Sequence, residues 1–372
     1  MEPTAHGIRR YARMKNLLLR FNVTKSVLAA LSLSVAGIPA ASAIVAGDPN
    51  LASEPDSPDL RIDPNTMQSL FAGVGSITAF DDLGRGTFLC TATPITSRHI
   101  LTAAHCITDG MGNINLAPEN VRFFLNFGGN ITSTISAVTL TKHPEWRGFD
   151  TSLFNDIAVI TLSEDLPAGV PIYELLERSL VATPSPTGTI GAGAETITLV
   201  GYGTSGTGAT GTGTTPGPAN SGVYNVPARF EVKRTGQNVV DGLFSENNAA
   251  IPEVFIFDFD DPIASRTLNQ TGGPTLGNRR EGQLGPGDSG GPSFVTDTDG
   301  RMKLAGVNTF TFNFPSTPLI GRAPNTPSFG SGGGGMQVAA YRDFINSAIP
   351  EPSSALLVVS GAGLLGLRRR RA

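Results

Sequence analysis

The sequence of 372 residues predicts an all-β fold, and three observations support this prediction. Its 45 glycines and 27 prolines accompany only 7% aromatic residues, a balance typical of many turns between short strands. Segments that are apolar, or that alternate between apolar and polar residues, recur between the turn residues. No long internal pattern with helical periodicity competes with them. With 40% hydrophobic and 16% charged residues, the chain can bury a sizeable core in one large or two small domains.

The strand patterns begin after residues 44–70, a stretch rich in Pro, Asp, Ser and Asn that we expect to be extended. Residues 72–80 carry the first convincing strand pattern. Further strands are expected in the first half at 87–94, 121–126, 131–139 and 157–162. The composition then shifts to Pro, Thr and Gly over 180–193, which we interpret as a connector. A second half begins near Glu195.

Two segments of the second half have patterns of their own. Residues 204–222 are rich in Gly and Thr and lack the Lys-Ser/Thr ending of a phosphate-binding loop, so a flexible surface loop is predicted. Residues 341–349 place apolar side chains at the spacing of an amphipathic helix, which we expect to pack on the domain. Asp297 and Asp299 precede Gly300 and favour a hairpin turn over a calcium site. We predict no metal site and no cofactor.

The first 43 residues are typical of an export signal. A basic region follows Met14, which is a possible true start, and an apolar core at 27–38 leads to the small residues Ala-Ser-Ala at 41–43. The alternative is a membrane anchor, but the apolar run is shorter than the ~20 residues needed to span a bilayer. We therefore expect signal peptidase to release a mature chain that begins at Ile44.

Residues 350–372 also form a distinct terminal segment. They read Pro-Glu-Pro, then an apolar stretch at 355–367, then four arginines at 368–371. This arrangement resembles the PEP-CTERM sorting signal of Gram-negative bacteria, which implies processing by an exosortase after transient membrane contact and an extracellular or cell-surface location. A permanent tail anchor is the alternative, although the apolar stretch is short for a stable span.

Charge and cysteine content narrow the function further. Without the two terminal segments, 17 basic and 29 acidic residues remain, a net charge of -12, which should repel nucleic acid. Cys90 and Cys106 are the only cysteines, and an isolated pair in an exported protein favours a disulfide. A loop this short would stabilise the fold by roughly 3 kcal/mol. His105 lies inside this loop, beside Cys106.

The strongest chemical motif is Gly-Asp-Ser-Gly-Gly-Pro at 287–292. A serine hydroxyl becomes a good nucleophile only when a base removes its proton, and the resulting oxyanion needs backbone donors held in place. Glycines allow the tight turn that supplies such donors. We expect Ser289 to be the nucleophile and the N–H groups of Gly287 and Ser289 to form an oxyanion hole.

A second motif, Leu-Thr-Ala-Ala-His-Cys at 101–106, supplies the candidate base. Its small residues allow close packing behind the imidazole of His105. In the mature chain the other histidines, His99 and His143, lack this setting.

A third motif places Asp156 at the start of the apolar run 157–162. A carboxylate there can orient the imidazole of His105 and stabilise its cation. Alone this signal is weak, because Asp before a strand is usually a turn residue. The chain order His, Asp, Ser gives it weight, since subtilisins and α/β-hydrolases use other orders.

Together these motifs resemble the trypsin-like serine proteases, and similarity extends over residues 71–349. His-Pro at 143–144, Leu-Val-Gly-Tyr-Gly at 199–203 and Leu-Ala-Gly-Val at 304–307 also look like family segments. The spacing of the two cysteines matches the disulfide that brackets the family's histidine. The resemblance implies two antiparallel six-stranded β-barrels of the chymotrypsin type, at 71–185 and 194–340, with a C-terminal helix and the site between them.

The sequence departs from trypsin at the expected specificity pocket. Gln283 stands where trypsins carry the aspartate that selects Lys or Arg. The wall that is often Ser-Trp-Gly is Thr309, Phe310 and Thr311, and the glycine-rich run at 330–335 leaves the opposite wall unassigned. We therefore expect a preference for apolar or small side chains. The disulfide that usually braces the serine loop is absent.

Activation in the family pairs a buried aspartate with a new N-terminal amine. Asp288 resembles this aspartate, and Ile-Val-Ala-Gly at 44–47 resembles the mature start, so a salt bridge between Ile44 and Asp288 is implied. Cleavage between Arg61 and Ile62 is the alternative start.

These inferences favour a secreted serine endopeptidase that acts on proteins or peptides. The main alternative is a non-catalytic protein of the same fold that binds an extracellular polymer. A secreted esterase is a third possibility, weakened by the lack of a Gly-x-Ser-x-Gly turn at Ser289.

Overall fold

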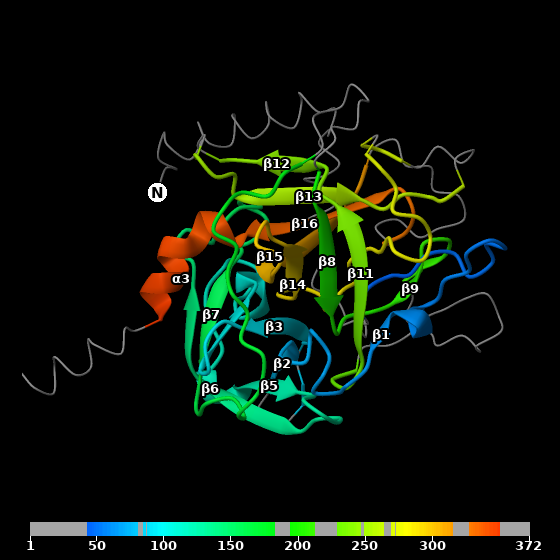
Figure 1. The fold of residues 1–372 in the computed structure, drawn as a ribbon. Helices are drawn as coiled ribbons and strands as arrows, with labels where there is room; N and C mark the ends of the chain where they lie inside the picture. Colours follow the sequence, from blue (N-terminus) through cyan, green and yellow to red (C-terminus); the bar gives the residue numbers. More distant parts are fainter. Residues whose placement is uncertain are drawn as a thin grey trace, which may run out of the picture.

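The computed structural model describes most of the chain between the two terminal segments (Figure 1). The described ranges are 43–80, 85–86, 88–182, 194–212, 229–246, 249–263, 269–271, 273–314 and 327–349. The predicted signal (residues 1–43) lies outside them except for Ala43, as does the whole sorting segment (350–372). Within the described ranges, no helix has the length and apolar character needed to cross a membrane.

The first half forms a closed barrel of six antiparallel strands, in the order β2-β3-β4-β7-β6-β5. The strands are β2 (Gly75–Ala79), β3 (Cys90–Pro94), β4 (His99–Thr102), β5 (Val121–Leu125), β6 (Ser133–Lys142) and β7 (Ala158–Leu162). The predicted strands therefore lie in this barrel, with shifted ends. Sequence reasoning missed β4, because four residues next to the histidine motif are too short to show alternation.

The second half forms an eight-stranded sheet in the order β1-β11-β8-β14-β15-β16-β13-β12. The strands are β1 (Ile62–Asp63), β8 (Thr196–Gly201), β11 (Lys233–Val239), β12 (Gly242–Phe244), β13 (Val254–Asp258), β14 (Pro292–Thr296), β15 (Met302–Asn313) and β16 (Ser331–Gln337). A small hairpin, β9 (Gly206–Thr207) with β10 (Gly211–Thr212), lies apart from it.

The expected second six-stranded barrel is not shown by the described strands. Strands β11 and β13 would have to pair to close it, and side chains join them instead. The Asn238 side-chain amide donates to the carbonyl of Asp258 (2.7 Å), and the Asp258 N–H donates to the carboxylate of Asp241 (2.9 Å). These two hydrogen bonds link the end of β11 and the residue Asp241 to β13.

The described helices are short and lie in the segments that precede, connect or follow the strands. They are η1 (Pro58–Arg61), η2 (Ala104–Cys106), η3 (Pro118–Asn120), η5 (Val338–Tyr341) and α3 (Arg342–Ala348). The predicted helix at 341–349 is confirmed in place. Its Tyr341 and Ile345 are buried, and α3 lies against β7 (Figure 1).

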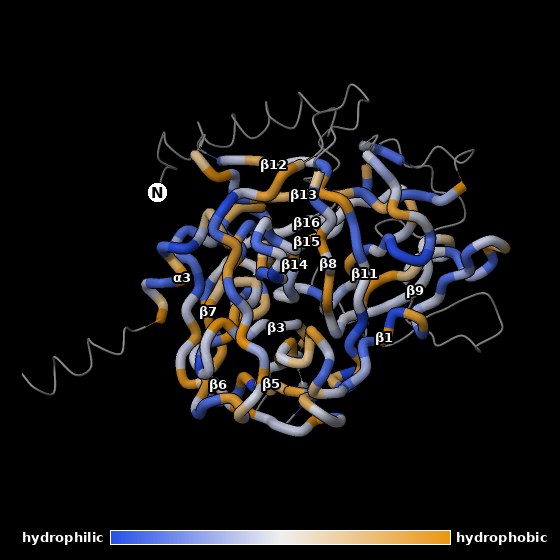
Figure 2. Tube along the Cα trace, viewed as in Figure 1, coloured by the Kyte–Doolittle hydropathy of each residue, from blue (hydrophilic) through white to orange (hydrophobic). Residues whose placement is uncertain are grey.

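One continuous core joins the barrel to the sheet, with apolar residues along the strands of both (Figure 2). Tyr202, which follows β8, is fully buried at the junction. Its hydroxyl donates to the carbonyl of Val74 (3.1 Å) and accepts from the Asn126 amide (2.9 Å). Burial raises the pKa of this phenol, so it stays a neutral donor between the two halves.

The start of the segment at residues 44–70 is more deeply buried than its polar composition predicts. Ile44, Val45 and Ala46 are fully buried, and Val45 pairs with Gln283 through two backbone hydrogen bonds of 2.7 and 3.2 Å. The segment ends in β1, which pairs with β11. It is thus part of the second half, although it precedes the barrel in sequence.

A group of carboxylates lies between β13 and the segment that leads to the serine loop. Asp258, Asp260 and Glu281 are almost fully buried. Glu281 accepts from the Asp260 N–H (2.6 Å), whereas Asp260 Oδ1 has no hydrogen-bond partner in the part of the chain that the structure describes. Burial first, and then the neighbouring carboxylates, raise the pKa of Asp260.

Asp260→Asn should therefore stabilise the protein at pH 8. A carboxyl group whose pKa is raised on folding makes its full contribution to the free energy of unfolding below its ordinary pKa of 3.8. That contribution is lost as the pH rises. The variant should gain more than about 1 kcal/mol in free energy of unfolding at pH 8, and little at pH 3.5. Urea denaturation at both pH values measures this difference. A variant less stable than wild type at pH 8 would contradict it.

Candidate active site

The barrel brings His105 and Asp156 together at one end. Strands β4 and β7 are antiparallel with Thr102 opposite Ala158, so the residues just after β4 and just before β7 are neighbours. Asp156 is fully buried and accepts two hydrogen bonds from His105, one from the backbone N–H (2.8 Å) and one from ring Nδ1 (2.7 Å). A carboxylate only accepts, so Nδ1 carries a proton, and in the neutral imidazole the lone pair is then on Nε2.

Asn155 fixes the backbone immediately before Asp156. Its φ of 69° lies in the left-handed region, which Asn tolerates better than most residues. Its N–H donates to the hydroxyl of Tyr341 (2.9 Å). The C-terminal η5 turn therefore helps to hold the carboxylate, a contact that the sequence motif did not reveal.

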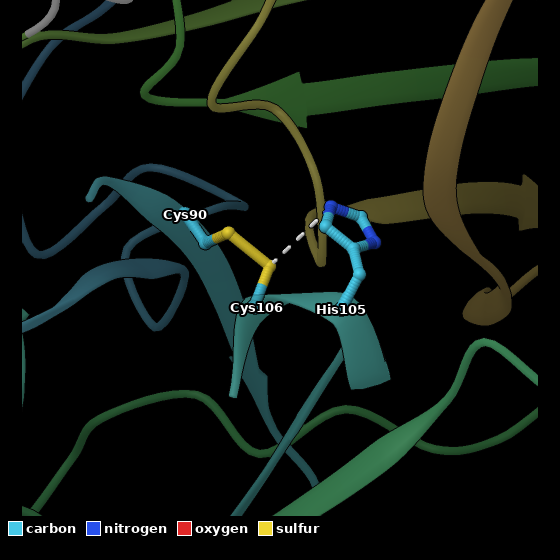
Figure 3. A group of neighbouring side chains, drawn as sticks. All are labelled: Cys90, His105 and Cys106. Carbon is cyan, nitrogen blue, oxygen red and sulfur yellow. Dashed lines mark hydrogen bonds between the residues drawn. A yellow bond between two sulfur atoms is a disulfide. The ribbon is translucent and has the colours of Figure 1, made fainter. Parts of the chain in front are cut away.

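The predicted disulfide between Cys90 and Cys106 is confirmed, with an S–S distance of 2.05 Å. It joins the start of β3 to the η2 turn that carries His105 (Figure 3). Cys106 Sγ lies 3.9 Å from His105 Nε2, and the possible ligand atoms of the three residues lie within 4.8 Å of one another. Both sulfurs are oxidised in the disulfide, so neither offers the thiolate that a metal would need.

The loop that carries Ser289 is anchored to both halves of the molecule. The carbonyl of Ser289 accepts from the N–H of Thr91 on β3 (2.8 Å), and the N–H of Gly290 donates to the carbonyl of Asn308 on β15 (2.7 Å). Gly290 has a φ of 80°, and a Cβ there would overlap Thr91 and Thr102. Only glycine fits this close contact with the barrel.

Two backbone donors beside Ser289 are unused. Gly287 has a φ of 97°. Within the described ranges, neither its N–H nor that of Ser289 donates a hydrogen bond to the protein. Backbone donors near a buried surface are normally satisfied. These two are therefore suited to an oxygen atom supplied by a ligand.

His105 and Ser289 line the same cavity, whose volume is 290 Å³. Its other lining residues are Phe149, Leu284, Gly285, Pro286, Thr309, Phe310 and Thr311. No hydrogen bond joins Ser289 to His105 in the described structure. Such bonds are often long without a substrate. Phe149, which sequence reasoning missed, packs on the imidazole with ring centroids 5.0 Å apart.

The expected specificity residues separate into two groups. Thr309, Phe310 and Thr311 line the cavity, whereas Gln283 is fully buried and is not among the residues that line it. Both ends of the Gln283 amide are already used. Its Oε1 accepts from the N–H of Leu284 (2.8 Å), and its Nε2 donates to the hydroxyl of Ser331 (3.1 Å). The side chain of Gln283 is therefore neutral, and its hydrogen bonds are made within the protein.

Asp288 is fully buried behind the serine. One oxygen accepts from the backbone N–H groups of Ile44 and Gly285 (both 2.8 Å), and the other from that of Gly203 (2.9 Å). Burial nevertheless raises the pKa of Asp288 to about 7. The buried Arg234 is the cation that lowers this pKa, and in this continuous chain the nitrogen of Ile44 is still an uncharged amide.

The structure places Ile44, rather than Ile62, at Asp288. Ile44 is fully buried, whereas Ile62 is 44% exposed at the sheet edge on β1. The Ile44 side chain packs against Gly236 and Gly282, where an added Cβ would lie 2.7 and 3.0 Å from its Cγ2. The environment of Ile44 thus leaves no room for larger neighbours.

Comparisons with known proteins agree with these motifs over part of the chain. Residues 72–238 match the model of the trypsin family, a range that includes His105 and Asp156 and ends before Ser289. Over 90 residues the chain is 36% identical to chymotrypsin-C of Rattus norvegicus and to that of Mus musculus, covering 23% of this chain. The match spans 29% of the length of each of these relatives.

Solved structures give a more distant likeness. A structure titled HL collagenase is 17% identical, with a TM-score of 0.45, and the match covers 76% of this chain and 96% of that one.

Removal of the disulfide should weaken the fold around His105. Replacing Cys90 and Cys106 together by Ala opens a link between residues 16 positions apart, so the free energy of unfolding should fall by roughly 3 kcal/mol. Denaturant unfolding of the double variant gives this value. An unchanged free energy would mean that the link does not constrain the unfolded chain.

Proposed function

We propose that this chain is a secreted serine endopeptidase that hydrolyses peptide bonds through an acyl-enzyme on Ser289. One observation carries the proposal. An imidazole held through Nδ1 by a buried carboxylate shares a cavity with a serine whose loop offers two unused backbone N–H groups. A base, a nucleophile and oxyanion donors in one cavity are the parts that acyl transfer requires.

The proposed reaction proceeds in two halves. His105 Nε2 takes the proton of Ser289 as its oxygen attacks the substrate carbonyl carbon. The carbonyl oxygen becomes an oxyanion and receives hydrogen bonds from the N–H groups of Gly287 and Ser289. His105 then returns the proton to the departing amine, which leaves the acyl group on Ser289. Water, activated by the same base, hydrolyses the ester and regenerates the serine.

Asp156 supports both halves of this reaction. It holds the imidazole in the tautomer with Nδ1 protonated, and its negative charge stabilises the imidazolium that forms twice in each cycle. Full burial keeps water away from this contact, which strengthens the electrostatic attraction.

The partial match to the trypsin family and to chymotrypsin-C supports peptide hydrolysis over the alternatives. A non-catalytic polymer-binding protein would not need the buried carboxylate, the oriented imidazole and the unused donors at once. Those three features therefore favour an enzyme.

We further propose that the protein is exported and sorted to the surface of a Gram-negative bacterium. The support lies in the sequence of the terminal segments, which implies signal peptidase and an exosortase as partners. The disulfide fits an oxidising compartment. The position of Ile44 also fits cleavage after Ala43, because that cut would create an amine 2.8 Å from Asp288.

Ser289→Ala should abolish peptide hydrolysis, lowering kcat by on the order of 10⁶, because the residues of such a site act as a unit. Binding of a reversible peptide inhibitor should survive, since the cavity is unchanged. Turnover on a peptide library, with inhibitor affinity as the control, measures both effects. Substantial hydrolysis by the folded variant would exclude Ser289 as the nucleophile.

The wild-type enzyme should cleave after apolar or small residues. The described residues that line the cavity include no Asp or Glu, and Gln283 is neutral, so the charge of a substrate Lys or Arg would be buried without a partner, which is costly. Discrimination among apolar residues should be modest, about 1 to 3 kcal/mol per methylene. A cleavage profile on a mixed peptide library tests this specificity. Dominant cleavage after Lys or Arg would contradict it.

A further inference from the structure

A buried ion pair lies next to the segment that leads to the serine loop. The side chains of Arg61 and Asp56 are 5% and 1% exposed, with Nη2 2.5 Å from Oδ2. The guanidinium also donates to three backbone carbonyls, those of Asn278 (3.0 Å), Arg280 (2.8 Å) and Glu281 (2.8 Å). Arginine alone has the planar fork of donors that can serve so many acceptors at once.

The same carboxylate also holds the chain that follows Ile44. Asp56 Oδ2 accepts from the N–H of Gly47 (2.6 Å), and the Asp56 N–H donates to the carbonyl of Asp48 (3.2 Å). Asn278 completes the set: it accepts from the Asp48 N–H (2.7 Å) and donates back to the Asp48 carbonyl (2.8 Å). A Cβ at Gly47 would overlap Asn278, so the contact requires glycine.

These contacts, here called the Arg61 clamp (Asp56, Arg61 and Asn278), connect two distant parts of the sequence. One part is the stretch just after Ile44. The other ends two residues before Gln283, whose backbone pairs with Val45. The chain has only two cysteines, and both are used in the barrel. Noncovalent contacts must therefore brace the serine loop.

We infer that Arg61 is a positioning residue that acts through Asp56 and Asn278 to keep the nitrogen of Ile44 at Asp288. This inference rests on the proposed function and on release of the chain at Ile44. With residues 45–48 held in place, the free amine has a very short tether, and a short tether gives a high effective concentration at its partner. Without the clamp, the amine would leave its pocket more often.

The clamp differs from an ordinary structural ion pair in what its loss should change. Loss of an ordinary structural ion pair lowers the stability of the whole fold. Loss of the Arg61 clamp should also shift the local equilibrium between the inserted and the withdrawn α-amine of Ile44. The reason is that the clamp restrains the chain on either side of the site where this amine meets Asp288.

The test uses the exported protein after confirmation by mass spectrometry that it begins at Ile44. Labelled acetic anhydride reacts with the α-amine only when the amine is withdrawn, so the rate of Ile44 acetylation reports the local equilibrium without any need for activity. In Arg61→Gln the rate should rise at least about tenfold, and in Arg61→Lys, which keeps the charge but not the fork, by less.

A matched control is Arg178→Gln. Arg178 also pairs with two carboxylates, those of Glu195 (2.6 Å) and Asp297 (2.9 Å), but not with the chain after Ile44. This variant should leave the acetylation rate at the wild-type value. If Arg61→Gln does not fold, Asp56→Asn removes the same charge pair with almost no change in shape and should accelerate acetylation similarly.

A second readout is the alkaline limit of activity. The inserted amine must stay protonated to pair with Asp288, so a clamp variant should lose activity at a pH lower by about one unit, the shift that a tenfold change in insertion gives. Equal acetylation rates in wild type and Arg61→Gln would overturn the inference, as would a mature chain that begins elsewhere. Wild type that neither hydrolyses peptides nor reacts at Ser289 would instead refute the proposed function.

Discussion

The arrangement of the site depends on one buried carboxylate. Asp288 immediately precedes Ser289, is sealed from water, and accepts hydrogen bonds from residues far apart in the sequence. An ionised carboxylate in such a place is costly unless it is paired. In the continuous chain burial raises its pKa, although the backbone donors and the charge of Arg234 act in the opposite direction. A positive charge from Ile44 would complete the pairing and fix the backbone of the serine loop.

The location of the site follows from the way the two halves meet. The barrel supplies His105 and Asp156 from the neighbouring ends of β4 and β7. The sheet supplies Ser289 from the loop before β14, and Thr91 and Asn308 hold that loop from opposite sides. The two halves approach closely at Gly290, where an added Cβ would overlap Thr91 and Thr102. The disulfide and Asn155 each fix one of the barrel's contributions.

Local sequence predicted which residues the structure brings together better than it predicted the architecture. The three motifs carried the candidate residues because acyl transfer needs particular residue types in particular turns, and the strands of the barrel showed clear alternation. The eight-stranded sheet was not predictable in this way, because its strand order depends on pairing between strands that are distant in sequence. The same holds for Arg61, Phe149 and Tyr341, whose partners lie far away in sequence. The hydrogen bond between Gln283 and Ser331 also depends on tertiary structure.

The central claim is that one chain beginning at Ile44 carries a reactive serine at 289. Treatment of the exported protein with a fluorophosphonate, followed by mass spectrometry of its peptides, tests both parts in one measurement. The account predicts an N-terminal peptide that starts at Ile44 and a single phosphonylated residue, Ser289, with the reaction prevented by prior denaturation. A modified residue other than Ser289, or no modification of the folded protein, would contradict it.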